Sequence, residues 1–263
     1  MESIGSGNVK IGIEGNRADV VLNRPEKRNA MNGALLSDLA AALDRLEDNP
    51  DIRAMTLLGE GDVFCAGMDL EMMRDRGEPD GTKLETGLDD ITERIANLRI
   101  PSVASIKGAA IAGAFELVLP VDFRIISNDA KYGVIEVRLG VFPHGGATQR
   151  LPRLVGLSKA KEIVLTGDYI DPEEAADIGL VHEVVEDREI TDERARAWAD
   201  DLSENAPLGM ERARRCLNAA FDVPLEDGLE LESALGEQLV HTDDYTEGFT
   251  ARLEGRDPEF VGK

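Results

Sequence analysis

The chain has 263 residues, and 52 acidic residues against 29 basic ones give it a formal net charge of −23. So acidic a surface repels nucleic acid and anionic membranes, which argues against both as binding partners. The length fits one large α/β domain or one domain with a helical appendage, and the hydrophobic content of 42% argues against global disorder. No apolar run approaches the roughly 20 residues that cross a bilayer.

The start of the chain and its charge suggest where the protein works. The sequence MESIGSGNVK has neither the basic flank nor the apolar core of a signal peptide, so we expect a cytoplasmic protein. Concentrated salt shortens the range of charge repulsion to a few ångströms and makes such an acidic surface tolerable. The charge therefore favours a cytosolic protein of a halophile over an acidic mesophilic enzyme.

The cysteines and histidines do not indicate a metal or redox site. Cys65 and Cys216 are too few for a disulfide framework and do not form a Cys-x-x-Cys pair. His144, His182 and His241 are scattered along the chain. We therefore expect neither a bound metal nor structural disulfides.

The first half of the chain alternates strands and helices, which predicts an α/β fold. The predicted elements are a hairpin of strands 9–14 and 18–23, helix 34–47, strand 54–58, helix 88–99, strand 102–106, a helix starting near Gly113, and strand 122–127. Glycines punctuate the loop at 59–70. The segment 74–87 is polar and broken by glycine and proline, so we expect it to be mobile.

The second half is mainly helical. Apolar spacing and short turn signals predict helices at 158–166, 172–178 and 189–204 and two more within 207–242. No low-complexity linker divides the chain. The C-terminal helices are therefore expected to pack on the α/β core or on another subunit.

The run AAIAGAFEL at 109–117 places a carboxylate, Glu116, among small and apolar residues. Burying an unpaired charge is costly, so Glu116 either faces water or has a function there. Gly113 stands just before a predicted helix, where a free backbone N–H can hold developing negative charge. In FCAGMDL, Gly67 permits close approach and the Met68 N–H offers a second donor. Two such donors that converge would form an oxyanion hole.

Glu136 is a second acid in a largely apolar, strand-like run, KYGVIEVRLGVFP. Two carboxylates in apolar surroundings can have different pKa values, so that one acts as base and the other as acid. The alternative for either residue is an exposed glutamate or a salt bridge to Arg124 or Arg138.

Four blocks and a tail carry a resemblance to a known family. They are LNRPEKRNAM at 22–31, FCAGMDL at 64–70, AGAFEL at 112–117, EVRLGVFPHGGATQRL at 136–151 and EGFTARLEGRDPEFVGK at 247–263. In order and spacing they resemble the enoyl-CoA hydratase/isomerase, or crotonase, family over nearly the entire chain. The resemblance implies an α/β spiral of repeated ββα units at 1–200 and a C-terminal helical region at 201–263. It also implies a homotrimer or a dimer of trimers.

The resemblance implies a site for an acyl-CoA thioester. The Met68 and Gly113 N–H groups would hold the thioester carbonyl, Glu116 would activate water, and Glu136 would supply a proton to the α-carbon. The family's coenzyme A contacts correspond to Lys27, Arg28, Ala30, Ala66, Met68, Asp69 and Leu70. Coenzyme A is part of the substrate here, so no separate cofactor is implied.

The presence of both glutamates favours an enoyl-CoA hydratase, and the resemblance suggests a role in fatty-acid β-oxidation. An isomerase or another crotonase reaction is the nearest alternative. A non-catalytic interaction or RNA-binding relative is the alternative of another class, and the net charge of −23 argues against RNA binding.

Four positions depart from the family's pattern: Ala114, His144, Ala147 and Arg252. His144 is interpreted as a loop residue, with tuning of the acyl pocket as the alternative. Phe260 and Lys263 are further residues that could reach the acyl or nucleotide portion of the substrate.

Overall fold

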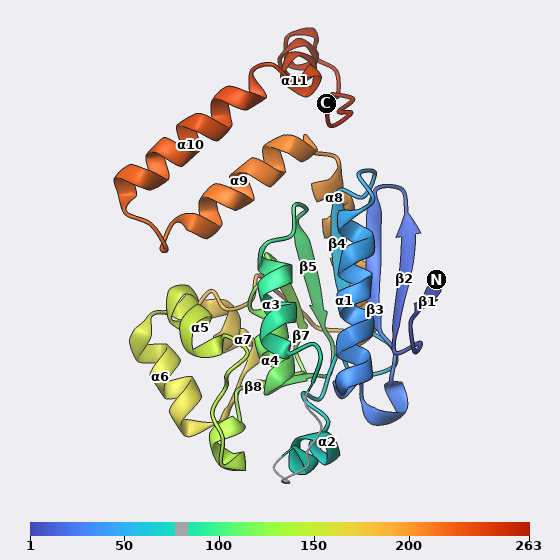
Figure 1. Cartoon of the computed structure of the whole chain (residues 1–263), viewed down its shortest axis with the longest axis vertical. Helices are drawn as coiled ribbons and strands as arrows, with labels where there is room; N and C mark the ends of the chain where they lie inside the picture. Colours follow the sequence, from blue (N-terminus) through green and yellow to red (C-terminus); the bar gives the residue numbers. More distant parts are fainter. Residues whose placement is uncertain (77–83) are drawn as a thin grey trace.

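The computed structural model describes residues 1–76 and 84–263. Within these residues, seven strands form a mixed sheet in the order β1-β2-β3-β4-β5-β7-β10 (Figure 1). Pairing is antiparallel from β1 to β3 and parallel from β3 to β10. The strands are β1 (Glu2–Ile4), β2 (Val9–Glu14), β3 (Arg17–Leu22), β4 (Ala54–Gly59), β5 (Ser102–Ile106), β7 (Phe123–Ser127) and β10 (Glu183–Val185).

Helices cover both faces of this sheet. Because side chains alternate along a strand, Val20 of β3 joins the core beneath α1 (Gly33–Glu47), whereas Val21 packs with Ala199 of α8 (Thr191–Ser203) on the opposite face. The leucines that recur at helical spacing along α1 are fully buried. Figure 1 shows α1 and α3 (Leu88–Ala96) in front of the sheet.

A second, smaller sheet positions the two acidic residues of interest. It has the order β6-β8-β9, built from β6 (Ala109–Ile111), β8 (Lys131–Gly133) and β9 (Tyr169–Ile170). β6 and β8 are parallel neighbours; β6 leads into helix α4 (Gly113–Val118), and β8 leads into the 3₁₀ helix η2 (Glu136–Leu139). Both elements therefore begin at the carboxyl ends of these parallel strands, which places Glu116 on α4 near Glu136 on η2.

The remaining helices follow in chain order. They are α2 (Leu70–Asp75), α5 (Ala147–Val155), α6 (Leu157–Thr166), α7 (Pro172–Asp177), α9 (Pro207–Ala219), α10 (Leu225–Leu239) and α11 (Asp243–Glu254). Figure 1 shows α9, α10 and α11, coloured orange to red, extending beyond one end of the main sheet.

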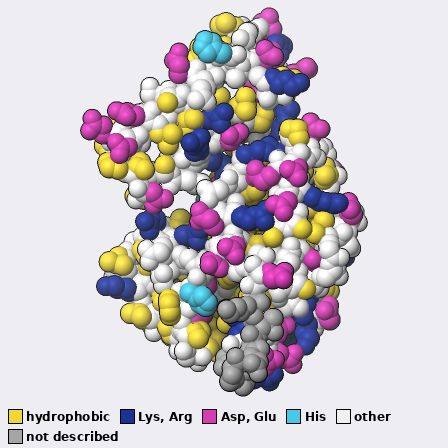
Figure 2. Space-filling view, viewed as in Figure 1, with side chains coloured by type: hydrophobic (Ala, Val, Ile, Leu, Met, Phe, Trp, Pro, Cys, Tyr) yellow, Lys and Arg dark blue, Asp and Glu magenta, His cyan; other side chains and the backbone are white. Residues whose placement is uncertain are grey.

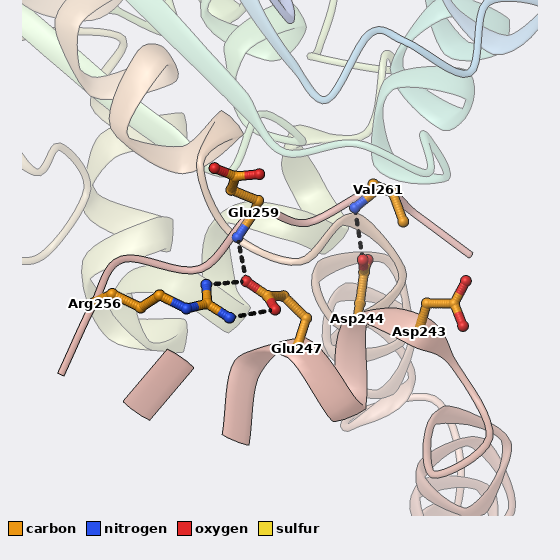
Figure 3. A pocket seen from close by; sticks show the side chains of 6 residues that line it. All are labelled: Asp243, Asp244, Glu247, Arg256, Glu259 and Val261. Carbon is orange, nitrogen blue, oxygen red and sulfur yellow. Dashed lines mark hydrogen bonds and ion pairs between the residues drawn. The ribbon is translucent and has the colours of Figure 1, made fainter. Parts of the chain in front are cut away.

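The end of the chain folds back on α11 (Figure 3). The Arg256 guanidinium donates from Nη1 to one Glu247 carboxylate oxygen at 2.6 Å and from Nη2 to the other at 2.8 Å. The Asp244 carboxylate accepts from the Val261 N–H at 2.6 Å. These contacts enclose a surface hollow of about 380 Å³ and fix the tail to this chain's own helix.

The predicted hairpin, the helix at 34–47, and the strands at 54–58, 102–106 and 122–127 are confirmed to within a few residues. The strand-like interpretation around Glu136 is wrong, because Glu136–Leu139 forms η2, which ends at Gly140 with φ of 78°. The helices α5 and α11 were not predicted. Of the segment 74–87 that was expected to be mobile, residues 77–83 lie outside the described residues.

Candidate active site

The FCAGMDL loop lies between two other segments of the chain. Its Met68 pairs in parallel with Met31, and its Cys65 pairs in parallel with Ala110. Met68 follows Cys65 by three residues, and Gly113 follows Ala110 by three. The Met68 Cγ lies 3.0 Å from the position that a Cβ on Gly113 would occupy. Met68 and Gly113, predicted to act together, are therefore neighbours.

Gly67 makes this close approach possible. Its φ of +100° lies in a region that favours glycine. A Cβ at this position would come within 2.6 Å of the Ile111 carbonyl oxygen. The absence of a side chain at Gly67 thus allows the loop to lie against the end of β6.

The Met68 and Gly113 backbone amides are available for a ligand. Gly113 is the first residue of α4, where a helix leaves its N–H groups without an internal partner. Within the described parts of the chain, neither amide donates a hydrogen bond to a protein acceptor. Two adjacent free donors of this kind can hold a carbonyl oxygen that gains negative charge.

Ala112 introduces α4 in a strained conformation. Its φ of 54° and ψ of −121° are unusual for a residue with a Cβ, and such strain costs on the order of 1–3 kcal/mol. The Ala112 N–H donates to the Gly133 carbonyl at 2.8 Å, which ties this turn to β8. The surrounding structure therefore fixes the turn that presents the Gly113 N–H.

Glu116 follows Gly113 by one helical turn and is 3% exposed. Its Oε1 accepts hydrogen bonds from the backbone N–H groups of Gly145 at 2.8 Å and Ala147 at 3.0 Å. Burial raises the pKa of this carboxyl, whereas the two backbone donors favour its ionised form. Glu116 is thus a buried carboxyl whose ionised form is stabilised by two backbone donors.

Glu136 is buried in a different environment. It is 6% exposed, and among the described residues neither of its carboxyl oxygens has a hydrogen-bond partner. Burial, with a smaller contribution from the nearby Glu116 charge, raises its pKa to about 7. At neutral pH, Glu136 is therefore the carboxyl of the pair that readily holds a proton.

His144 lies in the loop that holds Glu116. It precedes Gly145 directly, its ring is exposed, and its Nδ1 lies 3.1 Å from the Phe142 carbonyl oxygen. Its positive form lowers the pKa of both Glu116 and Glu136. His144 is thus an exposed loop residue that lies near both carboxyls.

The residues predicted to contact coenzyme A lie on two loops that meet. Ala66 N–H donates to the Arg28 carbonyl at 3.0 Å, and Met31 N–H donates to the Gly67 carbonyl at 2.8 Å. Ala30 and Ala66 are partly buried there, while Arg28 and the nearby Leu70 are exposed.

Two of these residues already have partners in the protein. Lys27, at the end of η1 (Pro25–Lys27), forms an ion pair with Glu71 at 3.8 Å. Asp69 caps α2 (Leu70–Asp75) and forms an ion pair with Arg24 at 3.3 Å, so its carboxylate has a structural role.

Phe260 and Lys263 belong to the tail that folds on α11. The Phe260 carbonyl accepts from the Arg53 guanidinium at 2.9 Å, and the Lys263 carbonyl accepts from the Asp243 N–H at 2.7 Å.

Several residues that shape the site were not predicted from the sequence. Gly145 and Ala147 supply the donors to Glu116, and no clear sequence signal marks them, because the helix that begins at Ala147 was not predicted. Leu88 packs over the site, since its Cδ2 lies 3.1 Å from a Cβ placed on Gly113 and 2.8 Å from one on Gly145. Asn29 was also missed.

Asn29 is fully buried and joins the two loops that were predicted to contact coenzyme A. Its side-chain amide donates to the carbonyls of Glu60, Val63 and Phe64 at 2.8–3.0 Å. This buried amide therefore fixes the spacing between the loops.

The described residues, 1–76 and 84–263, contain neither a metal-binding cluster nor a membrane-spanning helix. No cluster of three His, Cys, Asp or Glu side chains there is arranged to hold a metal ion. None of the helices in that part combines the length and apolarity needed to cross a bilayer.

Comparison with known proteins gives a consistent result. Residues 12–263 match the profile of the family described as Enoyl-CoA hydratase/isomerase. An enoyl-CoA isomerase/hydratase of Mycosarcoma maydis is 35% identical over 253 residues, which cover 93% of this chain and 92% of that protein. The mitochondrial methylglutaconyl-CoA hydratase of Mus musculus is 35% identical over 256 residues, covering 95% of this chain and 82% of the relative.

The fold agrees with the sequence match. The crystal structure of an enoyl-CoA hydratase from Bacillus anthracis superposes with a TM-score of 0.90 at 33% identity, covering 97% of this chain and 100% of that one. The predicted crotonase-type α/β fold is confirmed, whereas the comparisons give no support to a halophilic origin. The chain belongs to the enoyl-CoA hydratase/isomerase family and has its crotonase fold.

Proposed function

We propose that the chain is an enoyl-CoA hydratase, which adds water reversibly to a 2-enoyl-CoA to give a 3-hydroxyacyl-CoA. The observation that carries this proposal is the unlike hydrogen bonding of two neighbouring buried glutamates. Glu116 accepts from two backbone N–H groups, whereas the Glu136 oxygens have no partner among the described residues. Such a pair provides one ionised and one protonated carboxyl at the same pH.

In the proposed hydration step, each glutamate transfers one proton. The ionised Glu116 takes a proton from a water molecule as the water oxygen bonds to the β-carbon of the enoyl thioester. The electrons of the double bond move toward the thioester carbonyl, and the Met68 and Gly113 N–H groups stabilise the resulting enolate. Glu136 then gives its proton to the α-carbon. A proton returned from Glu116 to Glu136, directly or through water, restores the starting state.

Coenzyme A would lie along the two loops that carry Arg28, Ala30, Ala66 and Leu70, with Lys27 at their edge. Exposed cations at Lys27 and Arg28 support this placement, because they offer positive charge to phosphates on a strongly acidic protein. The cytoplasmic location and a role in fatty-acid β-oxidation remain predictions from the sequence.

Double-bond isomerisation is the second candidate. It is favoured by the relative from Mycosarcoma maydis, whose name includes both activities. An isomerase moves one proton between two carbons and needs no water. One of the two glutamates could then be replaced without loss of turnover.

Hydration of crotonyl-CoA tests the proposal. We expect the parent protein to hydrate it and Glu116→Gln to lower kcat roughly 10²-fold or more, because a positioned base is lost. Glu162→Gln is the matched control, since Glu162 is an exposed glutamate on α6 and should leave kcat unchanged. Parent-like hydration by Glu116→Gln, or turnover only of a 3-enoyl-CoA, would contradict the proposed function.

We also propose that residues 201–263 form an assembly region and that the protein is a homotrimer or a dimer of trimers. Large apolar side chains on α9 and α10 support this proposal, since Leu217 is 72% exposed and Leu225 is 80% exposed. Figure 2 shows yellow apolar side chains on the C-terminal helices. We expect light scattering to give a multiple of three chains, and Leu225→Glu to lower the mass.

Ile13→Glu is the control for that experiment. Ile13 is 58% exposed on β2, outside the proposed assembly region, so its substitution should leave the mass unchanged. A parent protein with the mass of one chain would refute the oligomer.

A further inference from the structure

Arg124 is a buried cation with an unusual set of partners. It lies on β7, is 3% exposed, and its guanidinium Nε donates to the Leu180 carbonyl at 2.8 Å. Its Nη1 donates to the carbonyls of Val118 at 3.2 Å, Leu119 at 3.3 Å and Val121. Burying a charge without a carboxylate partner is costly, so these contacts require an explanation.

The Arg124 contacts satisfy one end of α4. A helix leaves its last carbonyls without an internal partner, and here the residues that carry them, such as Val118 and Leu119, are buried away from water. The guanidinium supplies a donor to the Leu119 carbonyl and a second donor to the Val118 carbonyl, which also accepts from the Val121 N–H at 3.3 Å. It also connects this end of α4 to Leu180, which lies between α7 and β10.

The opposite end of α4 carries the groups that meet the substrate in the proposed reaction. Gly113 is its first residue, Glu116 lies one turn on, and Ala112 holds the strained turn before it. A strained backbone persists only where the surrounding structure fixes it. The Ala112 N–H bond to Gly133 fixes one end, and the Arg124 bonds fix the other.

We propose that Arg124 is a positioning residue, which acts through α4 to aim the Gly113 N–H and the Glu116 carboxylate at the thioester. The helix has six residues, so it is roughly 9 Å long at about 1.5 Å per residue. A small tilt at the Arg124 end therefore displaces the substrate end. A misplacement of about 1 Å can lower a rate on the order of 10²-fold.

The test compares Arg124→Met and Arg124→Lys with the same substitutions at Arg17. Arg17 is also 3% exposed, and its guanidinium donates several hydrogen bonds. Its partners are the carboxylates of Glu14, Asp19 and Asp200, which are not part of α4. Both sets of variants should lower Tm. At a temperature well below every Tm, we expect Arg124→Met to lower kcat roughly 10²-fold with little change in KM, and the Arg17 variants to keep the parent kcat.

Arg124→Lys keeps a charge but has a single donor atom, so we expect a partial loss of kcat. If Arg124→Met does not fold, this variant decides the question. Parent-like kcat in a folded Arg124 variant, or an equal loss in the matching Arg17 variant, would overturn the positioning role.

The kcat test rests on the proposed hydratase function, so a second readout is needed that does not require turnover. Infrared difference spectra of bound butyryl-CoA labelled with ¹³C at the thioester carbonyl report how strongly the two amides polarise it. We expect the carbonyl frequency to move toward the free value in the Arg124 variants and to stay at the parent value in the Arg17 variants. An unchanged frequency in the Arg124 variants would refute the inference even if the protein catalyses another reaction.

Discussion

At the scale of single residues, Glu136 is the buried acid whose protonation changes near neutral pH. Its pKa is about 7 in the folded chain, because it is buried without a hydrogen-bond partner among the described residues. In an unfolded chain a glutamate has a pKa of about 4.3. Between these values the folded state binds more protons than the unfolded state, so stability falls as the pH rises.

This difference predicts a stability change on substitution. We expect the Tm of the parent protein to fall between about pH 5 and pH 8, and Glu136→Gln to reduce that fall, because its amide does not ionise. Part of the slope should remain, since burial also raises the pKa of Glu116. Scanning calorimetry across this range measures the effect, with Glu162→Gln as control. A parent-like slope in Glu136→Gln would contradict it.

The sequence indicates the acids of the site but not the groups that distinguish them. Glu116 and Glu136 could be selected because each interrupts an apolar run. Their environments could not be read from those runs, because the donors to Glu116 lie 29 and 31 residues further along the chain. Which carboxyl is ionised therefore depends on tertiary contacts.

At the scale of elements, the position of the FCAGMDL loop against β6 depends on Gly67. We expect Gly67→Ala to lower Tm and kcat, because the new Cβ would meet the Ile111 carbonyl oxygen at 2.6 Å in addition to the strain of a φ of +100°. The strain alone costs on the order of 1–3 kcal/mol. The effect can be measured by thermal unfolding and by crotonyl-CoA turnover.

Gly7→Ala separates the clash from the strain. Gly7 has a φ of +88°, and a Cβ there would have no atom within 4 Å. Its substitution should therefore cost the strain but leave kcat unchanged. Equal losses of Tm and kcat in the two variants would contradict the claim that the loop needs a glycine at position 67 in order to contact β6.

Elements with a clear period were predictable, and those fixed by tertiary contacts were not. The leucines of α1 repeat at helical spacing, and the apolar strands β4 and β5 are bounded by turn residues. The run around Glu136 contains apolar residues at strand-like spacing, yet it forms η2 in the structure. Helix α5 follows a Gly-Gly pair and contains Pro152, so its sequence resembles a loop.

At the scale of the whole molecule, the order of the motif blocks was sufficient to predict the fold family. It did not reveal how the two sheets bring the blocks together. The parallel pairing of β6 with β8 places Glu116 and Glu136 at one edge, although strands of three residues carry too little pattern to be predicted. Their pairing depends on the packing of the whole chain.

The net charge of −23 predicts a dependence of the whole molecule on salt. Figure 2 shows acidic side chains spread over the visible face, where they repel one another. The screening length is about 30 Å at 0.01 M salt and about 10 Å at 0.1 M, so we expect Tm to rise steeply over this range. Sodium chloride and potassium chloride should act alike at equal ionic strength, because screening does not depend on which cation is present. A Tm that stays constant from 0.01 M to 1 M salt would show that surface repulsion does not limit the stability of this chain.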